Sequence, residues 1–362
     1  MTTQSTVGSN TTRAWVDIDL GALLRNGAAI ARHAGVPILP MVKADAYGLG
    51  VVPVMRTLAK LDPFGFGVAT VNEGRELRSS GAWRPVIVFT PLLAEELAAA
   101  RELNLIPTLG SAHTITEWVG IGGGPWHLAI DTGVSRAGVR WDRIGEVAEA
   151  VRRSPPEGAF THFHSAELDN GTMEVQEKRF RDAIAALPER PAILHADNSA
   201  AAVRRSPSPW SVVRPGVFLY GVGSGPGAAL QPEPVAHLRA RVVELRDLAA
   251  GDSVGYDATW CASRASRVAT LALGYADGYR RSLGNRAEAL LHGRRVPVVG
   301  TVMMDMTVLD VSDVPCALGD VATLFGADGD ELLTVEAVAE RASLSPYELL
   351  TGLRQRVARV HA

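Results

Sequence analysis

The chain alternates short β-rich runs with helical stretches, and this alternation constrains the fold more than any other feature. Eight runs have the composition of strands, at 38–43, 65–70, 85–90, 105–109, 126–131, 158–163, 192–197 and 211–214. Most intervening segments carry one apolar helical face, such as Leu20, Leu23, Leu24, Ala28 and Ala31 before the first strand. An open doubly wound sheet also alternates, but eight near-regular units favour closure. We therefore predict an α/β protein with a (β/α)8 TIM barrel.

The pattern changes after a stretch rich in Gly and Pro at 223–234, which indicates a linker. Strands joined by short turns are expected at 239–245, 267–273, 295–299 and 306–311, with helices only near 335–342 and 346–354. We predict a disordered tail at 1–12, a barrel at 13–234 and a mainly β C-terminal domain at 235–362. The run 14–18 is a candidate strand for pairing with that second domain.

Composition excludes several classes of partner. The 362 residues carry a net charge of −3, from 36 Lys and Arg against 39 Asp and Glu, so nothing calls for nucleic acid or an acidic membrane surface. Only Cys261 and Cys316 are present, which argues against a disulfide framework and fits a reducing compartment. No apolar signal region or membrane-length run is visible. We expect a cytoplasmic protein without a metal site.

The segment MVKADAYGLG at 41–50 places Lys43 at the end of an apolar strand. Catalytic groups of barrels gather at the C-terminal ends of the strands. A lysine in an apolar setting has a lowered pKa, so its amine can attack an aldehyde. Position alone favours a lysine that simply emerges into solvent there.

Further motifs favour the catalytic interpretation. In the same order along the chain, KADAYG (43–48) is followed by DTGVSRAGV (131–139), THF (161–163), HADNSAA (195–201), VRPGVFLYG (213–221), VGYDAT (254–259), GYADGY (274–279) and GTVMMDM (300–306). This series resembles the alanine racemases, which are fold-type III enzymes dependent on pyridoxal 5′-phosphate (PLP). The resemblance spans about residues 14–360. It implies PLP-dependent racemisation of a small amino acid, foremost L-alanine to D-alanine, by a homodimer with shared active sites.

The resemblance assigns the contacts with the cofactor. They are a Schiff base from Lys43, phosphate contacts from Tyr47, Ser199 and the backbone of Gly216 and Val217, and further contacts from His162, Asn198 and Arg214. Arg214 is expected to face the pyridine nitrogen, with His162 as an orienting partner between Arg214 and the catalytic tyrosine. Because arginine keeps its proton, the ring nitrogen would stay unprotonated, which makes the ring a weak electron sink suited to racemisation.

Two bases follow from the same resemblance, Lys43 on one side of the α-carbon and Tyr256 on the other. Tyrosine is a weak base at neutral pH, so cationic neighbours would have to stabilise the phenolate. Tyr256 lies in the second domain, which in this family covers the barrel mouth of the partner subunit. The resemblance implies that Arg136 contacts the phenolic oxygen of PLP and the carboxylate of the substrate. It also implies that the partner subunit supplies Tyr275, Met304 and Asp305 on the substrate side.

Two positions depart from the family pattern. Ala129 stands where many alanine racemases carry a carbamylated lysine that orients the arginine, and Gln355 aligns with a tyrosine that narrows the entrance. Both changes leave open a serine or broader-specificity racemase. The sequence is also compatible with a fold-type III decarboxylase, with a PLP carrier, or with a non-catalytic relative that sequesters an inhibitor.

Overall fold

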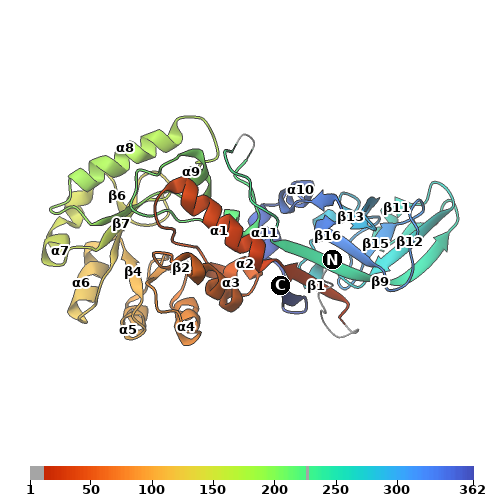
Figure 1. Cartoon of the computed structure of the whole chain (residues 1–362), viewed down its shortest axis with the longest axis horizontal. Helices are drawn as coiled ribbons and strands as arrows, with labels where there is room; N and C mark the ends of the chain where they lie inside the picture. Colours follow the sequence, from red (N-terminus) through yellow and green to blue (C-terminus); the bar gives the residue numbers. More distant parts are fainter. Residues whose placement is uncertain (1–11, 226–227) are drawn as a thin grey trace.

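The computed structural model describes residues 12–225 and 228–362, so all but the last residue of the expected tail at 1–12 lies outside it. Figure 1 shows two bodies side by side, a barrel of strands ringed by helices and a β-rich body at the C-terminal end. Strand β1 (Ala14–Ile18) belongs to the second body although it precedes the barrel in sequence. No helix within the described ranges is long and apolar enough to cross a membrane.

Parallel strands form the inner wall of the first body. In sheet order they are β2 (Phe66–Val68), β3 (Val86–Val88), β4 (Ile106–Leu109), β5 (His127–Asp131), β7 (Gly158–Phe160) and β8 (Ile193–His195), with the short β6 (Val139–Arg140) beside β5. Their residues are almost entirely buried, as expected of strands covered on both faces. The core is therefore the barrel interior and the layer beneath the helices.

The expected strands 38–43 and 211–214 close the ring, but each pairs only through isolated bridges, Ile38 to Val213 and Met41 to Gly67. Ser211 N donates to Leu194 O at 2.8 Å, which joins the last strand to β8. Prolines explain the short pairing, because Pro40 and Pro215 have no N–H to donate. The predicted fold class, a barrel followed by a mainly β domain, is confirmed.

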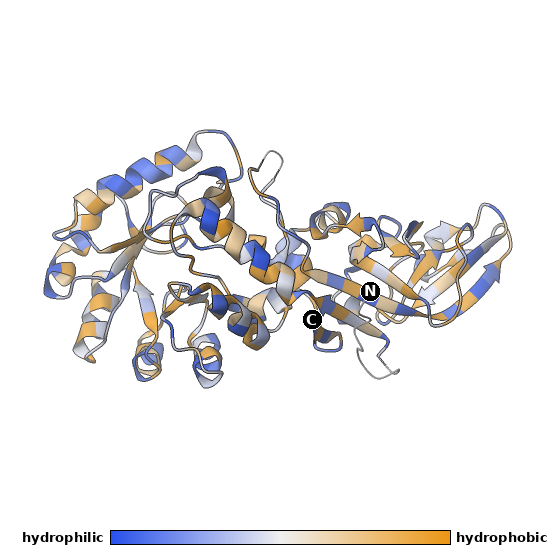
Figure 2. Ribbon diagram, viewed as in Figure 1, coloured by the Kyte–Doolittle hydropathy of each residue, from blue (hydrophilic) through white to orange (hydrophobic). Residues whose placement is uncertain are grey.

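Helices surround the strands. They are α1 (Leu20–Ala34), α2 (Lys43–Gly48), α3 (Val51–Leu58), η1 (Ala59–Leu61), α4 (Val71–Ser79), α5 (Ala94–Glu102), α6 (Ala112–Gly120), η2 (Ile144–Glu146), α7 (Ala148–Arg153), α8 (Thr172–Ala185), α9 (Ser199–Arg204) and η3 (Val217–Tyr220). Figure 2 shows the hydrophilic outer side of α8, the arrangement expected of an amphipathic helix.

The buried face of α1 matches the predicted one only in part, with Leu23 buried as expected and Leu20 and Ala31 packed at its edge. Leu23, Asn26, Gly27 and Ile30 are buried, whereas Leu20, Leu24, Ala28 and Ala31 are only partly covered. Asn26 Nδ2 donates to the carbonyls of Leu219 and Glu233, so a polar residue lies at the centre of this face. Apolar spacing alone missed a hydrogen-bonded asparagine as a core position.

The second body is built around a long sheet in the order β14-β13-β16-β9-β1-β18. Its strands and helices are β9 (Ala236–Leu248), β10 (Ser253–Val254), η4 (Tyr256–Ala258), β11 (Trp260–Cys261), β12 (Ser266–Leu271), η5 (Tyr275–Asp277), η6 (Arg281–Leu283), β13 (Glu288–Leu291), β14 (Arg294–Pro297), β15 (Thr307–Asp310), β16 (Val321–Asp328), β17 (Glu331–Leu333), α10 (Val335–Arg341), α11 (Pro346–Thr351) and β18 (Ala358–His361). Strand β1 pairs antiparallel with β9 and parallel with β18.

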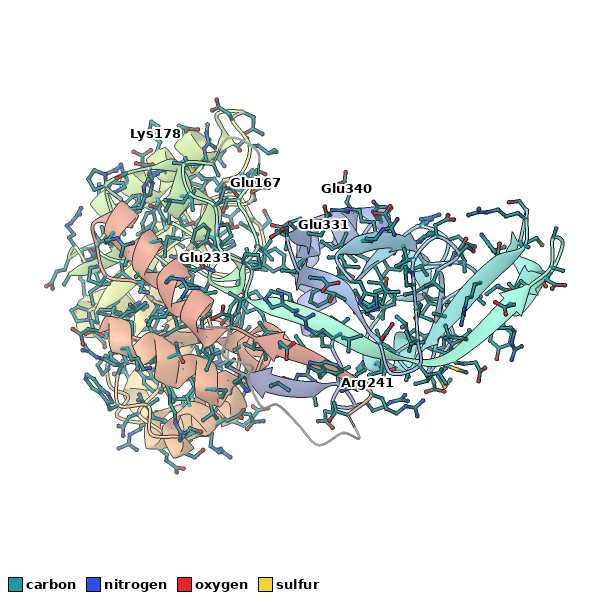
Figure 3. All side chains as sticks on the ribbon, turned by 45° about the vertical axis from the view of Figure 1, so that its right-hand side comes forward. Glu167, Lys178, Glu233, Arg241, Glu331 and Glu340 are labelled. Atoms are coloured by element: carbon teal, nitrogen blue, oxygen red, sulfur yellow. The ribbon has the colours of Figure 1, made fainter. Side chains whose placement is uncertain are left out.

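Specific contacts fix the junction between the bodies. Arg25 of α1 binds the carboxylate of Glu233 through Nε and Nη2, at 2.9 and 2.7 Å, and Figure 3 labels Glu233 at this junction. Helix α11 packs on α2, where a Cβ at Gly48 would lie 2.5 Å from the Leu350 carbonyl oxygen. Gly48 also has φ 84°, so both its backbone and its close contact require glycine. The second body therefore braces the turn that follows Lys43.

Candidate active site

Lys43 opens a left-handed turn. Ala44, Asp45, Ala46 and Tyr47 all have φ between 52° and 57°. Each non-glycine residue in this conformation costs roughly 1–2 kcal/mol, and such strain is typical of functional sites. Hydrogen bonds hold the turn, from Ala44 N to Glu73 Oε1 at 2.8 Å and from Val51 N to Asp45 Oδ1 at 2.7 Å. The backbone therefore presents Lys43 and Tyr47 in fixed directions.

The amine of Lys43 lies in a setting that favours its neutral form. Burial lowers the pKa of Lys43, and the nearby cation of Arg136 lowers it further, while Glu73 opposes the shift. Because the neutral amine is the nucleophile and the base, this environment suits covalent attachment of an aldehyde and proton transfer.

A phosphate-sized cradle lies beside Lys43. Ser199 Oγ accepts from the backbone N–H groups of Gly216 at 2.9 Å and Phe218 at 3.4 Å, so its own hydrogen is free to donate to a ligand. A Cβ at Gly216 would lie 2.4 Å from Tyr47 Oη, so only glycine fits there. Val217 opens the 3₁₀ turn η3 at the same place. The hydroxyls and the tight glycine approach fit the phosphate of PLP.

Asn198 is the N-cap of α9. Its Oδ1 accepts from Ala201 N at 3.0 Å, and its Nδ2 donates to Phe163 O at 3.4 Å. Ser199 is thereby left to bind the Gly216 loop. Lys43, Tyr47, Asn198, Ser199 and Arg214 line one cavity of about 590 Å³.

Arg214 is deeply buried, with 4% of its surface exposed. It donates to His195 Nδ1 at 3.0 Å and to the carbonyls of Thr161 at 2.7 Å and Ala196 at 3.0 Å. Burial lowers the pKa of Arg214 to about 10, with Asp197 opposing the shift. The guanidinium therefore stays charged at neutral pH, as its expected role requires.

His162 follows β7 at the mouth of the barrel. Burial and the positive charges of Arg214, Arg136 and Lys43 lower the pKa of His162 to about 3, so its ring is neutral at physiological pH. The hydrogen bonds of Arg214 lead to His195 and to carbonyls rather than to the His162 ring. His162 is thus a neutral neighbour of the cations.

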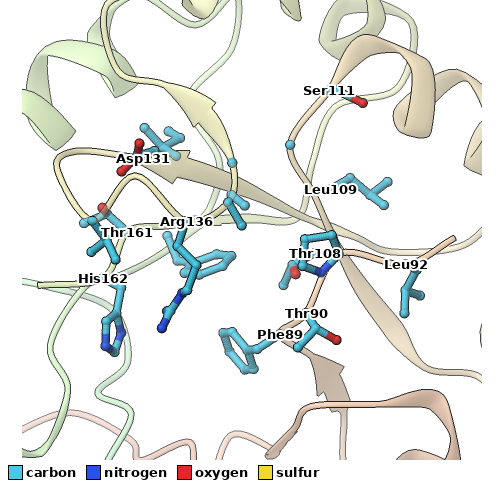
Figure 4. Close-up of a pocket in the computed structure, with 18 of the residues that line it drawn as sticks. Phe89, Thr90, Leu92, Thr108, Leu109, Ser111, Asp131, Arg136, Thr161 and His162 are labelled. Atoms are coloured by element: carbon cyan, nitrogen blue, oxygen red, sulfur yellow. The ribbon is translucent and has the colours of Figure 1, made fainter. Parts of the chain in front are cut away.

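A second cavity, of about 450 Å³, shares Lys43, Arg136 and His162 with the first. Figure 4 shows Arg136 and His162 pointing into the same opening, with Phe89 facing them. The loop that carries Arg136 is shaped by Asp131, whose Oδ1 accepts from Gly133 N and Ser135 N, both at 3.0 Å. Ala129 lines this cavity as well, so the short side chain leaves space on the Arg136 side.

The second-domain residues lie elsewhere in the single chain. The exposed fractions are 67% for Tyr256, 39% for Tyr275 and 52% for Met304, and these residues line neither cavity around Lys43. Tyr275 N donates to Met303 O at 3.0 Å, and Thr259 Oγ1 lies 3.3 Å from Thr301 Oγ1. The segments 254–259, 274–279 and 300–306 therefore form one surface, which we call the Tyr256 face.

Gln355 is exposed in the single chain and lines neither of the two cavities, so its expected place at the entrance stays a prediction. The adjacent Arg356 binds Asp277 at 2.9 Å and Asp305 at 2.8 Å, which holds this turn on the second domain. Tyr347 of α11 lines the phosphate side instead, with its ring centroid 6.0 Å from that of Tyr47. An aromatic wall is thus present, at a position that sequence spacing did not indicate.

Sequence reasoning also missed residues that support the site from behind. Gln176 of α8 donates to Thr132 Oγ1 at 3.1 Å and to His162 O at 3.0 Å, which ties together the loops that carry Arg136 and His162. His127 and His195 are buried side by side in the barrel, with Nδ1 and Nε2 2.7 Å apart. The sequence indicated each of these residues only as a histidine in an otherwise apolar strand, and this signal is weak when the fold is not known.

Comparisons with known proteins agree with this geometry. The models "Alanine racemase, N-terminal domain" and "Alanine racemase, C-terminal domain" match residues 18–224 and 235–361. An alanine racemase of Nostoc sp. is 34% identical, and the match covers 96% of this chain and 95% of that protein.

Solved structures of alanine racemases have the same fold as this chain. Alanine racemase of Bacillus anthracis with bound L-Ala-P has a TM-score of 0.90 at 28% identity, covering 98% of this chain and 96% of the other. That of Bartonella henselae with covalently bound pyridoxal phosphate has a TM-score of 0.88 at 27% identity, covering 97% and 99%. The chain belongs to the alanine racemase family.

Proposed function

We propose that this protein interconverts L- and D-alanine as a homodimer, with Lys43 and the partner subunit's Tyr256 as the two bases. Membership of the family makes the chain a PLP-dependent isomerase. One observation carries the proposal: Lys43, with its lowered pKa, lines a single cavity together with Tyr47, Ser199 and Arg214. Bound PLP would draw electrons from the α-carbon of the amino acid and make its hydrogen acidic.

Lys43 is the base for one face of the α-carbon. Its Nζ is partly buried beside Arg136, so the neutral amine that accepts a proton is favoured. The left-handed turn fixes the direction from which this amine approaches. Arg136 shares both cavities with Lys43 and is available to bind the substrate carboxylate.

Tyr256 cannot serve the other face within its own chain, because it is exposed and outside the cavities. The Tyr256 face also exposes Tyr275, Met304 and Met306, a group of large apolar side chains that favours burial against another surface. A second copy that covers the barrel mouth with this face would complete the site. Arg136 and Arg214 supply the positive charge that a tyrosine base requires.

Arg214 would present a permanent hydrogen-bond donor to the pyridine nitrogen of bound PLP. Its charge is retained in the buried setting, so it would donate a hydrogen bond to the ring nitrogen without giving up its proton, and the ring would remain a weak electron sink. Racemisation needs only a brief negative charge at the α-carbon. A weak electron sink does not stabilise that charge for long, and this disfavours side reactions.

Alanine is the substrate that the site favours. The case for serine depended partly on Gln355, which lies outside the cavity. Ala129 still leaves space beside Arg136, so a somewhat larger side chain remains a second candidate. The net charge of −3 gives no reason to expect nucleic-acid partners, and the two cysteines fit a reducing, cytoplasmic setting.

A direct experiment tests the assignment of Lys43 and the activity together. The purified protein is reduced with borohydride, digested and mapped, and the pyridoxyl label should be found on Lys43. Unreduced protein should invert L-alanine faster than L-serine in a chiral assay of a panel of amino acids. A label on another lysine, or no inversion of any amino acid, would contradict the proposal.

A further inference from the structure

Four side chains form a line through the interior of the barrel, away from the catalytic cavity. Arg214 Nη1 lies 3.0 Å from His195 Nδ1, and His195 Nε2 lies 2.7 Å from His127 Nδ1. His127 Nε2 then lies 3.9 Å from Glu157 Oε2. His195 ends β8, His127 begins β5 and Glu157 directly precedes β7, so the line runs from the mouth of the barrel toward its opposite end.

The direction of every hydrogen bond in this line is fixed by chemistry. Arginine can only donate, so His195 Nδ1 must accept and the hydrogen of the neutral ring must be on Nε2. That hydrogen is donated to His127 Nδ1, which places the hydrogen of His127 on Nε2. Burial lowers the pKa of both histidines, so both rings are neutral.

The line ends on a donor that needs an acceptor. His127 is fully buried, and its Nε2 has no hydrogen-bond partner within the part of the chain that the structure describes. An unpaired buried donor is unfavourable. The carboxylate of Glu157 is the charged group facing it, and its side chain is 41% exposed. A small rotation or one bridging water would close the gap.

The barrel is shaped around these two rings. Phe160 stacks on His195, with centroids 5.2 Å apart and planes at 10°. A Cβ at Gly158 would lie 2.7 Å from His127 Cε1, so glycine leaves the space that the imidazole occupies. Packing therefore fixes where the rings lie, and the donor Arg214 at one end together with an acceptor at the other selects the nitrogen that carries the hydrogen.

We propose that Glu157 is a positioning residue for the racemase: as the terminal acceptor it fixes the tautomers of His127 and His195 and so holds Arg214 as a donor toward the cofactor. The proposal rests on the proposed function for the role of Arg214. Glu157 acts from the far end of the barrel, on the side remote from the substrate.

Histidine tautomers test this directly. ¹⁵N-histidine spectra of the holoenzyme should show Nε2–H forms for both His127 and His195, with assignments from single His→Gln variants. Glu157→Gln should keep this pattern, because the amide oxygen can accept. Glu157→Leu should shift the Nε2 resonance of His127, whereas the control Glu146→Leu, at an exposed glutamate of η2, should not.

Kinetics provide a second measurement. We expect Glu157→Leu to lower kcat on the order of tenfold with KM nearly unchanged, and Glu157→Gln to recover most of the loss. An Nδ1–H form at either histidine in the wild-type protein would overturn the proposal, even if Glu157→Leu failed to fold. Identical spectra and kinetics for Glu157→Leu and Glu146→Leu would also overturn it. Correct tautomers without racemase activity would instead contradict the proposed function.

Discussion

The barrel mouth and the Tyr256 face present their reactive groups in opposite ways. Lys43 is partly buried on a strained left-handed turn beside the cation of Arg136, whereas Tyr256 is 67% exposed on the second domain. The first setting lowers the pKa of the amine with groups of the same chain, while the second leaves the hydroxyl of Tyr256 exposed. The contrast supports the proposal that each region is half of a site, which two chains would complete together.

The largest expected effect comes from removing the exposed half. Tyr256→Phe should slow racemisation on the order of 10²–10⁴-fold, because one proton transfer loses its base. PLP should remain bound, since the barrel residues hold it. Exchange of the α-hydrogen in D₂O should become strongly dependent on the enantiomer supplied. Equal loss of exchange from both enantiomers with the cofactor intact would contradict two bases on opposite faces.

A change in the barrel half should act on cofactor binding instead. Gly216→Ala places a Cβ 2.4 Å from Tyr47 Oη, so we expect PLP affinity to fall on the order of tenfold to a hundredfold. The matched control is Gly145→Ala, where a Cβ meets nothing within 4 Å. Titration of both apoproteins with PLP makes the comparison. Equal affinities would show that Gly216 does not shape the phosphate cradle.

A smaller effect concerns pH. Burial and Arg136 lower the pKa of Lys43, so the apoprotein should react with PLP at a lower pH than a free lysine, whose pKa is about 10.4. The rate should rise with pH as the neutral amine forms. Arg136→Gln removes the cationic neighbour and should move the midpoint of the profile upward. A midpoint that is unchanged or lower in this variant would argue against the charge effect.

The smallest effect is expected at Gln355. Because this side chain is exposed and outside the cavities, Gln355→Tyr should leave the ratio of kcat/KM for alanine and serine within about twofold of the wild-type value. Tyr347→Ala is the contrasting variant, since Tyr347 lines the phosphate side. A marked shift toward alanine in Gln355→Tyr would place Gln355 at the entrance of the assembled enzyme.

The sequence predicted the features that depend on local pattern. The alternating runs predicted the barrel, and the apolar strand before Lys43 placed that lysine at the mouth. The left-handed turn was not predictable, because no glycine occurs from Ala44 to Tyr47 and its support comes from Glu73 and α11. The contact between His127 and His195 joins residues 68 positions apart. Such contacts leave no periodic signal in a single sequence.

Strand pairing between segments far apart in the chain was also not predictable from the sequence. Strand β1 pairs with β9 more than two hundred residues later, and spacing could only mark it as a candidate. The strands at 38–43 and 211–214 pair only briefly because Pro40 and Pro215 have no N–H group to donate. The β-rich composition of these runs did not indicate how short the pairing would be. For Gln355 the place at the entrance stays a prediction, because motif spacing does not show which residue of a turn faces a cavity.

One measurement tests most directly whether the site is split between chains. Lys43→Ala and Tyr256→Phe proteins, each nearly inactive, are mixed, dissociated and reassembled. Random pairing gives half heterodimers, each with one intact site, so activity should return to about one quarter of the wild-type value. Lys43→Ala mixed with the double variant Lys43→Ala/Tyr256→Phe is the control and should stay inactive. If heterodimers form, as native mass spectrometry can verify, and no activity returns, the shared site is contradicted.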